Sequence, residues 1–151
     1  MLRPASSREA SIPGERVLLD THAFLWLMNG NPEIRQSDFL TDIERASETG
    51  GLLLCSISLF EVAAYAERGR IVPSIPIRDW IAGSLETPGL RLVPIDGPLA
   101  TEAATLPGKF AGDGADRLIV AAARLSHAAL ITADEDIAAY AAAGHVRIGR
   151  L

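Results

Sequence analysis

Five acidic residues that are far apart in this 151-residue chain each stand near a short apolar segment or at the start of a helical one: Asp20, Glu61, Asp113, Asp116 and Asp134. Carboxylates that are brought close together repel, and the pKa of one of them rises unless cations neutralise the charge. Their hard oxygen atoms favour Mg²⁺ or Mn²⁺. Two such ions about 4 Å apart can bind the attacking and leaving oxygens of a phosphoryl displacement. The chemistry to expect, if the fold assembles these acids, is that of a metal-dependent nuclease or phosphatase.

Short apolar runs alternate with helical patterns along the chain, which predicts strands at 17–19, 52–55, 90–93, 129–132 and 146–148. The helices expected from capping residues and apolar periodicity cover 21–28, 37–49, 58–68, 77–85, 96–106, 116–127 and 137–143. Strands that alternate with helices form βαβ units, in which right-handed crossovers place helices on both faces of a parallel sheet. We therefore expect an α/β fold.

This topology predicts where the acids lie. Asp20 directly follows the first strand, and Asp134 comes two residues after the fourth. A crossover helix runs antiparallel to the strands, so a residue in its first turn, such as Glu61 or Asp116, lies at the same edge. Sites in such sheets lie beyond the carboxyl ends of the strands, so four or five of these acids should meet there.

Each acid also has a purely structural explanation. Asp20 could cap the helix that begins at Thr21, and Ser58 and Glu61 have the spacing of a capping box. The other three acids could be favoured by a helix N-terminus or lie in a solvated turn.

Composition and charge exclude several classes of protein. Hydrophobic residues make up 48% and charged residues 22%, which is unlike a disordered chain. Purely apolar runs such as 118–123 are far too short to cross a membrane. Cys55 is the only cysteine, so no internal disulfide forms, and we expect a buried core residue in a cytoplasmic protein. Residues 1–15 lack the apolar segment of a signal peptide; we expect a flexible extension followed by one domain over 16–151.

The formal net charge of −5 argues against a basic coat that binds nucleic acids without specificity. Without the five acids named above, however, acidic and basic residues would each number 14. The acidity is therefore concentrated where cations could neutralise it, and an RNA-cutting enzyme remains compatible with the composition.

Four segments resemble the PIN-domain family, and within it the VapC-type toxins of bacterial toxin–antitoxin pairs: VLLDTHAFLWL (17–27), SISLFEVA (56–63), LPGKFAGDGADRLIVAAA (106–123) and LITADEDIAAY (130–140). The resemblance implies a PIN-like three-layer α/β/α sandwich with a central, mostly parallel sheet. It also implies an endoribonuclease that uses one or two Mg²⁺ or Mn²⁺ ions.

The same resemblance assigns catalytic and metal-binding roles to Asp20, Glu61, Asp116 and Asp134, with Asp113 as an additional metal ligand. Residues 113–117 read Asp-Gly-Ala-Asp-Arg, whereas the related subgroup has Asp-Pro-Phe-Asp-Arg, so we expect a looser loop here. Contacts with RNA or with metal-bound water are expected from Thr21, Thr132, Arg117 and Lys109, each of which also has a structural explanation.

The resemblance implies three kinds of partner: an RNA substrate, a small cognate antitoxin, and a second copy in a homodimer or a toxin–antitoxin hetero-oligomer. His22, His127 and His145 lack the spacing of a zinc site and are expected to be structural. Phe24, Trp26 and Tyr65 are among the apolar helix residues expected mostly in the core, some of them lining a groove for a partner helix.

Two alternatives to a nuclease remain open from the sequence. The first is a catalytically inactive PIN-fold module that binds partners or forms oligomers. The second is a phospho-acceptor domain resembling response-regulator receivers, which also gathers acids at strand ends. Such a domain needs a lysine after a late strand, whereas Lys109, the only lysine, precedes the helical stretch at 116–127.

Overall fold

The computed structural model describes residues 16–151, so the expectation for 1–15 falls outside the described residues. Five strands form one sheet in the order β3-β2-β1-β4-β5, and every neighbouring pair is parallel. The strands are β1 (Val17–Leu19), β2 (Leu52–Cys55), β3 (Leu90–Val93), β4 (Ala129–Thr132) and β5 (Ile148–Arg150). The first four have the predicted bounds. The fifth begins two residues late because the ladder starts with Ile148 opposite Leu130, while Val146 is buried in the core.

Eight helices connect and cover the strands within residues 16–151: α1 (Thr21–Asn29), α2 (Pro32–Arg35), α3 (Leu40–Thr49), α4 (Ile57–Glu67), α5 (Ile77–Ser84), α6 (Gly97–Ala104), α7 (Gly114–Leu125) and α8 (Glu135–Ala142). The short helix α2 was not predicted; the Asn31 side chain caps it through the Glu33 N–H at 2.9 Å. The helix predicted over 37–49 begins only at Leu40. None of these helices is long and apolar enough to cross a membrane.

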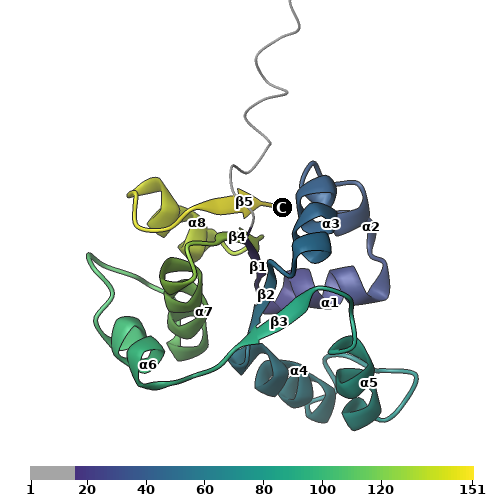
Figure 1. Cartoon of the computed structure of the whole chain (residues 1–151). Helices are drawn as coiled ribbons and strands as arrows, with labels where there is room; N and C mark the ends of the chain where they lie inside the picture. Colours follow the sequence, from purple (N-terminus) through teal and green to yellow (C-terminus); the bar gives the residue numbers. More distant parts are fainter. Residues whose placement is uncertain (1–15) are drawn as a thin grey trace, which may run out of the picture.

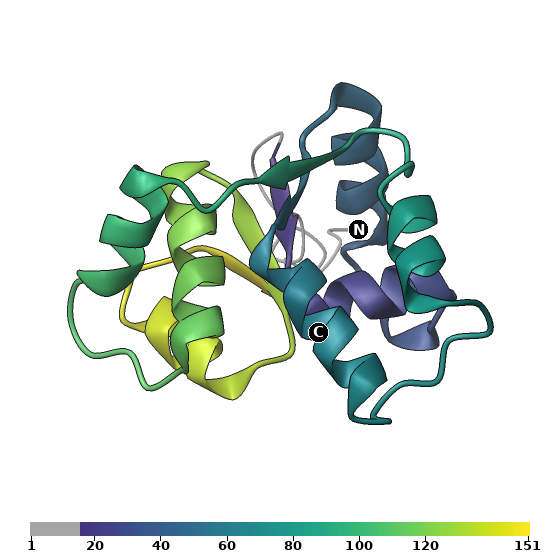
Figure 2. The ribbon, with the colours of Figure 1, turned by 90° about the horizontal axis from the view of Figure 1, so that it is seen from below.

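Alternating strand residues pack into two separate cores, one on each face of the sheet. Leu18, Leu53 and Leu130 pack with residues of α6, α7 and α8. Val17 and Leu19 belong to the second core, with residues of α1 to α5. Figures 1 and 2 show the two groups of helices on opposite sides of the sheet. Strands buried on both faces must be apolar throughout, which explains the uninterrupted apolar runs. The predicted three-layer α/β/α sandwich is confirmed.

Candidate active site

A cleft of about 430 Å³ lies beyond the carboxyl ends of β1 and β4 and is lined by all five predicted acids. They come from four places in the fold: the end of β1, helix α4, the start of α7 and the start of α8. Other side chains that line the cleft include Thr21, His22, Trp26 and Tyr65. The sheet topology therefore brings together carboxylates that are up to 114 residues apart in sequence, Asp20 and Asp134 being the extremes.

Asp20 is held by two hydrogen bonds at the end of the central strand. Its Oδ1 accepts from the Ala23 N–H at 2.7 Å, which caps α1, and its Oδ2 accepts from the Thr132 hydroxyl. Burial raises the pKa of the Asp20 carboxyl above its ordinary value, and these two bonds oppose that rise. Asp20 therefore does cap α1, as the structural explanation expected. The capping bond uses only one lone pair of a carboxylate that has about four.

Thr132 connects two of the acids rather than facing the cleft. It is completely buried at the end of β4. Its hydroxyl donates to Asp20 and accepts from the Asp134 N–H at 3.0 Å. The expectation that Thr132 contacts substrate or metal-bound water is thus corrected: the side chain is enclosed, and it orients Asp20.

Glu61 is held from the neighbouring helix α1. The Thr21 hydroxyl lies 2.6 Å from Glu61 Oε1 and 2.9 Å from Ser58 Oγ. A hydroxyl has one proton to give, and the carboxylate accepts it, so the Ser58 hydroxyl donates to Thr21. The Tyr65 hydroxyl donates to Glu61 Oε2 at 3.4 Å. Burial, and then the Glu61 charge, raise the pKa of Tyr65.

The predicted capping box of Ser58 and Glu61 is wrong. Helix α4 begins at Ile57, and its N-cap residue Ser56 makes no side-chain capping bond. Glu61 is therefore the fifth helical residue, a full turn inside the helix, where backbone donors are already paired. Its side chain is free to turn toward Thr21 and the cleft instead.

Asp113 and Asp116 form a reciprocal capping box at the start of α7. Asp113 Oδ1 accepts from the Asp116 N–H at 2.9 Å, and Asp116 Oδ2 accepts from the Asp113 N–H at 3.3 Å. These bonds close the turn, so the looser loop expected over 113–117 is wrong: the helix begins at Gly114, two residues earlier than predicted. Burial, followed by the charges of Asp113 and Asp134, raises the pKa of Asp116 from 3.8 to about 7.

Asp134 caps the next helix. Its Oδ1 accepts from the Ile137 N–H at 2.9 Å, so α8 begins at Glu135 and not at the predicted Ile137. The residue is half-buried and lines the cleft, which argues against the alternative of a solvated turn.

Two of the residues expected to contact substrate lie elsewhere. Arg117 donates from Nε to the Ala103 carbonyl at 2.8 Å and from Nη2 to the Ala104 carbonyl at 3.4 Å. These carbonyls end α6, where backbone acceptors lack helical partners, so the arginine completes that helix end. Lys109 is exposed on the loop before α7, and neither residue is among the described residues that line the cleft.

Three aromatic side chains of the cleft were not predicted as site residues. The ring of His22 lies 6.2 Å from that of Trp26 and 5.7 Å from that of Tyr65, measured between centroids. His22 is exposed, and the other two are half-buried. Their spacing is a signal that could have found them: His22 and Trp26 are four residues apart just after Asp20, and Tyr65 is four residues after Glu61. Such pairs share one face of a helix.

The donor set fits a hard divalent cation. All five acids offer oxygen ligands, and the raised pKa of Asp116 reflects first its burial and then the repulsion from Asp113 and Asp134, which a cation would relieve. Within residues 16–151, no three His, Cys, Asp or Glu side chains are arranged to hold one ion together. Mg²⁺ keeps several of its waters and needs only one or two carboxylates, so this arrangement suits it.

These features define a class: a parallel α/β protein with a carboxylate-lined cleft at the carboxyl edge of its sheet. The PIN domain family model matches residues 17–143. "Ribonuclease VapC22" of Mycobacterium tuberculosis is 38% identical over 118 residues, which cover 78% of this chain and 86% of the relative. The chain belongs to the PIN-domain family, as the sequence motifs indicated.

Solved structures of similar fold come from toxin–antitoxin complexes. VapBC2 of Rickettsia felis, bound to promoter DNA, matches with a TM-score of 0.63 and 15% identity, covering 87% of this chain and 96% of that one. A toxin–antitoxin complex of Klebsiella pneumoniae matches with a TM-score of 0.57 and 22% identity, covering 81% and 90%. DNA-bound VapBC of Salmonella typhimurium matches with a TM-score of 0.57 and 19% identity, covering 88% and 96%. At these identities the likeness establishes the fold.

Proposed function

We propose that this chain is an endoribonuclease that hydrolyses RNA phosphodiester bonds with the help of Mg²⁺ or Mn²⁺, and that it is the toxin of a toxin–antitoxin pair. The observation that carries this proposal is the gathering of five carboxylates in one cleft at the carboxyl edge of a PIN-domain sheet. The ribonuclease that shares 38% identity with the chain supports the activity. The toxin–antitoxin complexes among its structural neighbours support the biological role.

We assign Asp20 and Asp116 as the direct ligands of one or two ions. Glu61, Asp113 and Asp134 would complete the site directly or through water. A bound cation would supply an activated water at neutral pH and stabilise the charge on the leaving oxygen.

The chain's own residues prepare this site by fixing its carboxylates. Thr132 and the Ala23 N–H each hold one oxygen of Asp20, and the remaining lone pairs of the carboxylate stay available. The Ser58 and Thr21 hydroxyls hold Glu61 in the same manner. The raised pKa of Asp116 means that, without a cation, this carboxyl keeps its proton to about pH 7. A cation would displace that proton, so binding should strengthen as pH rises through neutrality.

The remaining expectations follow from this function. A small cognate antitoxin would silence the enzyme in the cytoplasm, and the toxin would act as a homodimer or be stored in a hetero-oligomer. Lys109, exposed on the loop before α7, could contact RNA outside the cleft. We propose that residues 16–151 form the single domain that carries these activities.

Cleavage of structured RNA by the purified chain tests the proposal. We expect fragments with Mg²⁺ or Mn²⁺, none with EDTA, and a loss of at least 100-fold in rate for Asp20→Asn and for Asp116→Asn. Asp136→Asn is the matched control, because Asp136 is exposed in the first turn of α8 and is not among the described residues that line the cleft. Cleavage that survives both site substitutions would refute the assigned site. An intact wild-type chain that cleaves no RNA but binds a partner would favour the inactive-module alternative.

A further inference from the structure

The cleft joins an acidic region to three aromatic rings that the proposed metal chemistry does not use. Helix α1 carries His22 and Trp26 directly after Asp20, and α4 carries Tyr65 four residues, or about 6 Å along the helix axis, after Glu61. Both helices thus continue from a carboxylate to an aromatic ring. We call His22, Trp26 and Tyr65 the aromatic row.

The rings of the aromatic row support one another. Trp26 and Tyr65 both lie within 6.2 Å of His22, at interplanar angles of 57° and 39°. Centroid separations of this size are typical of aromatic pairs in contact. His22 is the exposed member and therefore the ring most accessible from solvent, with the half-buried rings beside it. Tyr65 is further restrained by its hydroxyl bond to Glu61.

The charges of the cleft determine what can bind to these rings. Among the described residues that line the cleft there is no lysine or arginine. A nucleic-acid strand entering it therefore meets no lysine or arginine that would pair with its phosphates, and any bound cation would take that role. Base stacking on aromatic rings needs no such charge, and it contributes about 1–3 kcal/mol for each base.

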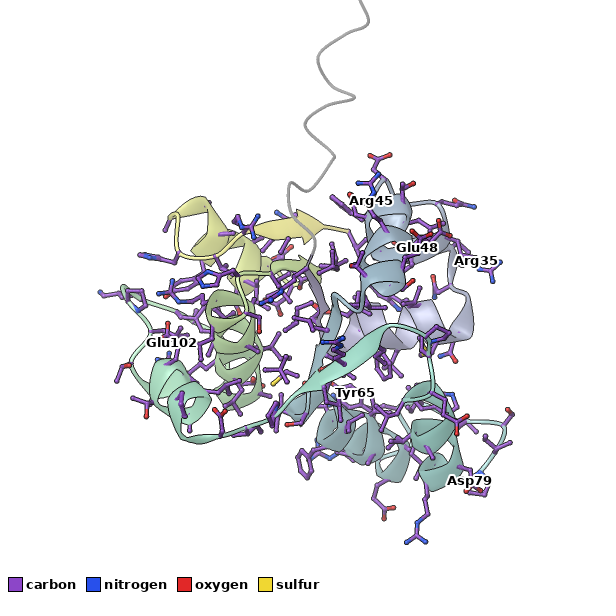
Figure 3. The ribbon with its side chains drawn as sticks, viewed as in Figure 1. Arg35, Arg45, Glu48, Tyr65, Asp79 and Glu102 are labelled. Carbon is purple, nitrogen blue, oxygen red and sulfur yellow. The ribbon has the colours of Figure 1, made fainter. Side chains whose placement is uncertain are left out.

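A basic residue follows the aromatic row on α4's side of the cleft. The guanidinium carbon of Arg70 lies 5.8 Å from the centroid of the Tyr65 ring, in a cation–π arrangement, and Arg70 is exposed. Along this side of the cleft, the acidic Glu61 is followed by the aromatic ring of Tyr65 and then by the basic side chain of Arg70. This order suits an RNA strand, in which phosphates alternate with nucleobases. Figure 3 labels Tyr65 on α4.

We propose that the aromatic row is a stacking platform for an unpaired RNA base adjacent to the cleaved phosphate, with Arg70 binding the next phosphate. This inference rests on the proposed ribonuclease function. It favours single-stranded segments, because a base inside a duplex must first be unpaired and unstacked, at a cost in free energy, before it can stack on protein. It also gives His22 a role in binding, where the sequence indicated only a structural one.

Binding measured without cleavage tests the platform first. The probes are a fluorescein-labelled oligoadenylate and the same strand paired with oligouridylate, both in Ca²⁺ buffer. We expect the single strand to bind more tightly, and His22→Ala and Tyr65→Leu each to weaken it by about 5- to 30-fold. Tyr65→Phe keeps the ring and should bind nearly as the wild type does. Phe60→Ala is the control, since Phe60 is an aromatic residue of the same helix, 68% exposed and not among the described residues that line the cleft.

Cleavage assays distinguish a failure of the stacking platform from a failure of the ribonuclease function. Once a cleavage position is mapped, an abasic residue beside it should raise KM for the wild type by as much as His22→Ala does on intact RNA. His22→Ala combined with the abasic RNA should raise KM little more than either change does alone. Equal RNA binding by His22→Ala, Tyr65→Leu and the wild type would overturn the platform. So would fully additive effects of His22→Ala and the abasic residue on KM. Either result would indicate that these rings bind a protein partner instead. A chain that binds through the platform yet never cleaves would refute only the ribonuclease function.

Discussion

Replacing Asp116 by asparagine should stabilise the cation-free protein at alkaline pH. Burial, together with the charges of Asp113 and Asp134, raises the pKa of Asp116 from 3.8 to about 7. At 1.36 kcal/mol for each tenfold change in the dissociation constant, the charged form is disfavoured by at most about 4 kcal/mol. Asp116 is only half-buried, so solvent screening reduces this to about 1–2 kcal/mol. Asparagine can keep the capping bond from the Asp113 N–H while removing the charge.

The sign of the effect depends on pH in a defined way. The pKa of Asp116 is higher in the folded state than in the unfolded chain, so the folded state binds more protons between about pH 4 and pH 7. Stability of the wild type therefore falls as pH rises through this window, and the loss is complete above it. The advantage of Asp116→Asn should be small near pH 4 and constant above about pH 7.

Thermal unfolding in EDTA over pH 4.5–8.5 measures this difference. A gain of about 1–2 kcal/mol corresponds to a rise in Tm of about 3–7 °C for a chain of this length. Asp136→Asn, at an exposed position, should stay within about 0.5 kcal/mol of the wild type. Saturating Mg²⁺ should raise the Tm of the wild type by mass action and cancel the advantage of the variant. A variant that is less stable at pH 8, or whose gain is the same at every pH, would refute the electrostatic reasoning.

Three further substitutions test the positioning of the site. Thr132→Val removes the hydroxyl bonds to Asp20 and to the Asp134 N–H. We expect kcat to fall by about 10- to 100-fold with little change in KM. An unchanged kcat would refute the positioning role of Thr132. Ser58→Ala removes a buried hydroxyl; we expect a loss of about 1 kcal/mol in urea unfolding and a lower kcat, and normal activity would show that Glu61 needs no such support. Arg117→Met should cost about 1–2 kcal/mol of unfolding free energy and leave KM for RNA unchanged, whereas a raised KM would return Arg117 to the binding site.

The sheet and the convergence of the acids were predictable because both depend on backbone patterns. Uninterrupted apolar runs such as 129–132 identify strands buried on both faces, and parallel topology then fixes which ends meet. Asp20 and Asp134 were predicted at the cleft from position alone, without any knowledge of where their side chains point.

Side-chain partners were harder to predict because they depend on which elements pack together. The capping box expected for Ser58 and Glu61 matched a local spacing, but α4 begins one residue earlier and Thr21, 40 residues away, takes the Glu61 carboxylate. Arg117 follows an acid in the motif, yet its guanidinium reaches the end of α6. In both cases the side chain forms its hydrogen bond with a partner distant in sequence instead of the local one.

The structural and functional explanations of the acids are not alternatives in this fold. Asp20, Asp113 and Asp134 each cap a helix, so the positive ends of α1, α7 and α8 all point toward the cleft. Those helix ends partly offset the mutual repulsion of the carboxylates before any cation binds. The same geometry dictates how the site should be probed: asparagine caps a helix about as well as aspartate, whereas alanine costs about 0.5–2 kcal/mol. Asp134→Asn should therefore lower activity at nearly normal Tm, and Asp134→Ala should lower both. Equal Tm values for the two variants would show that capping contributes nothing to the assembly of this site.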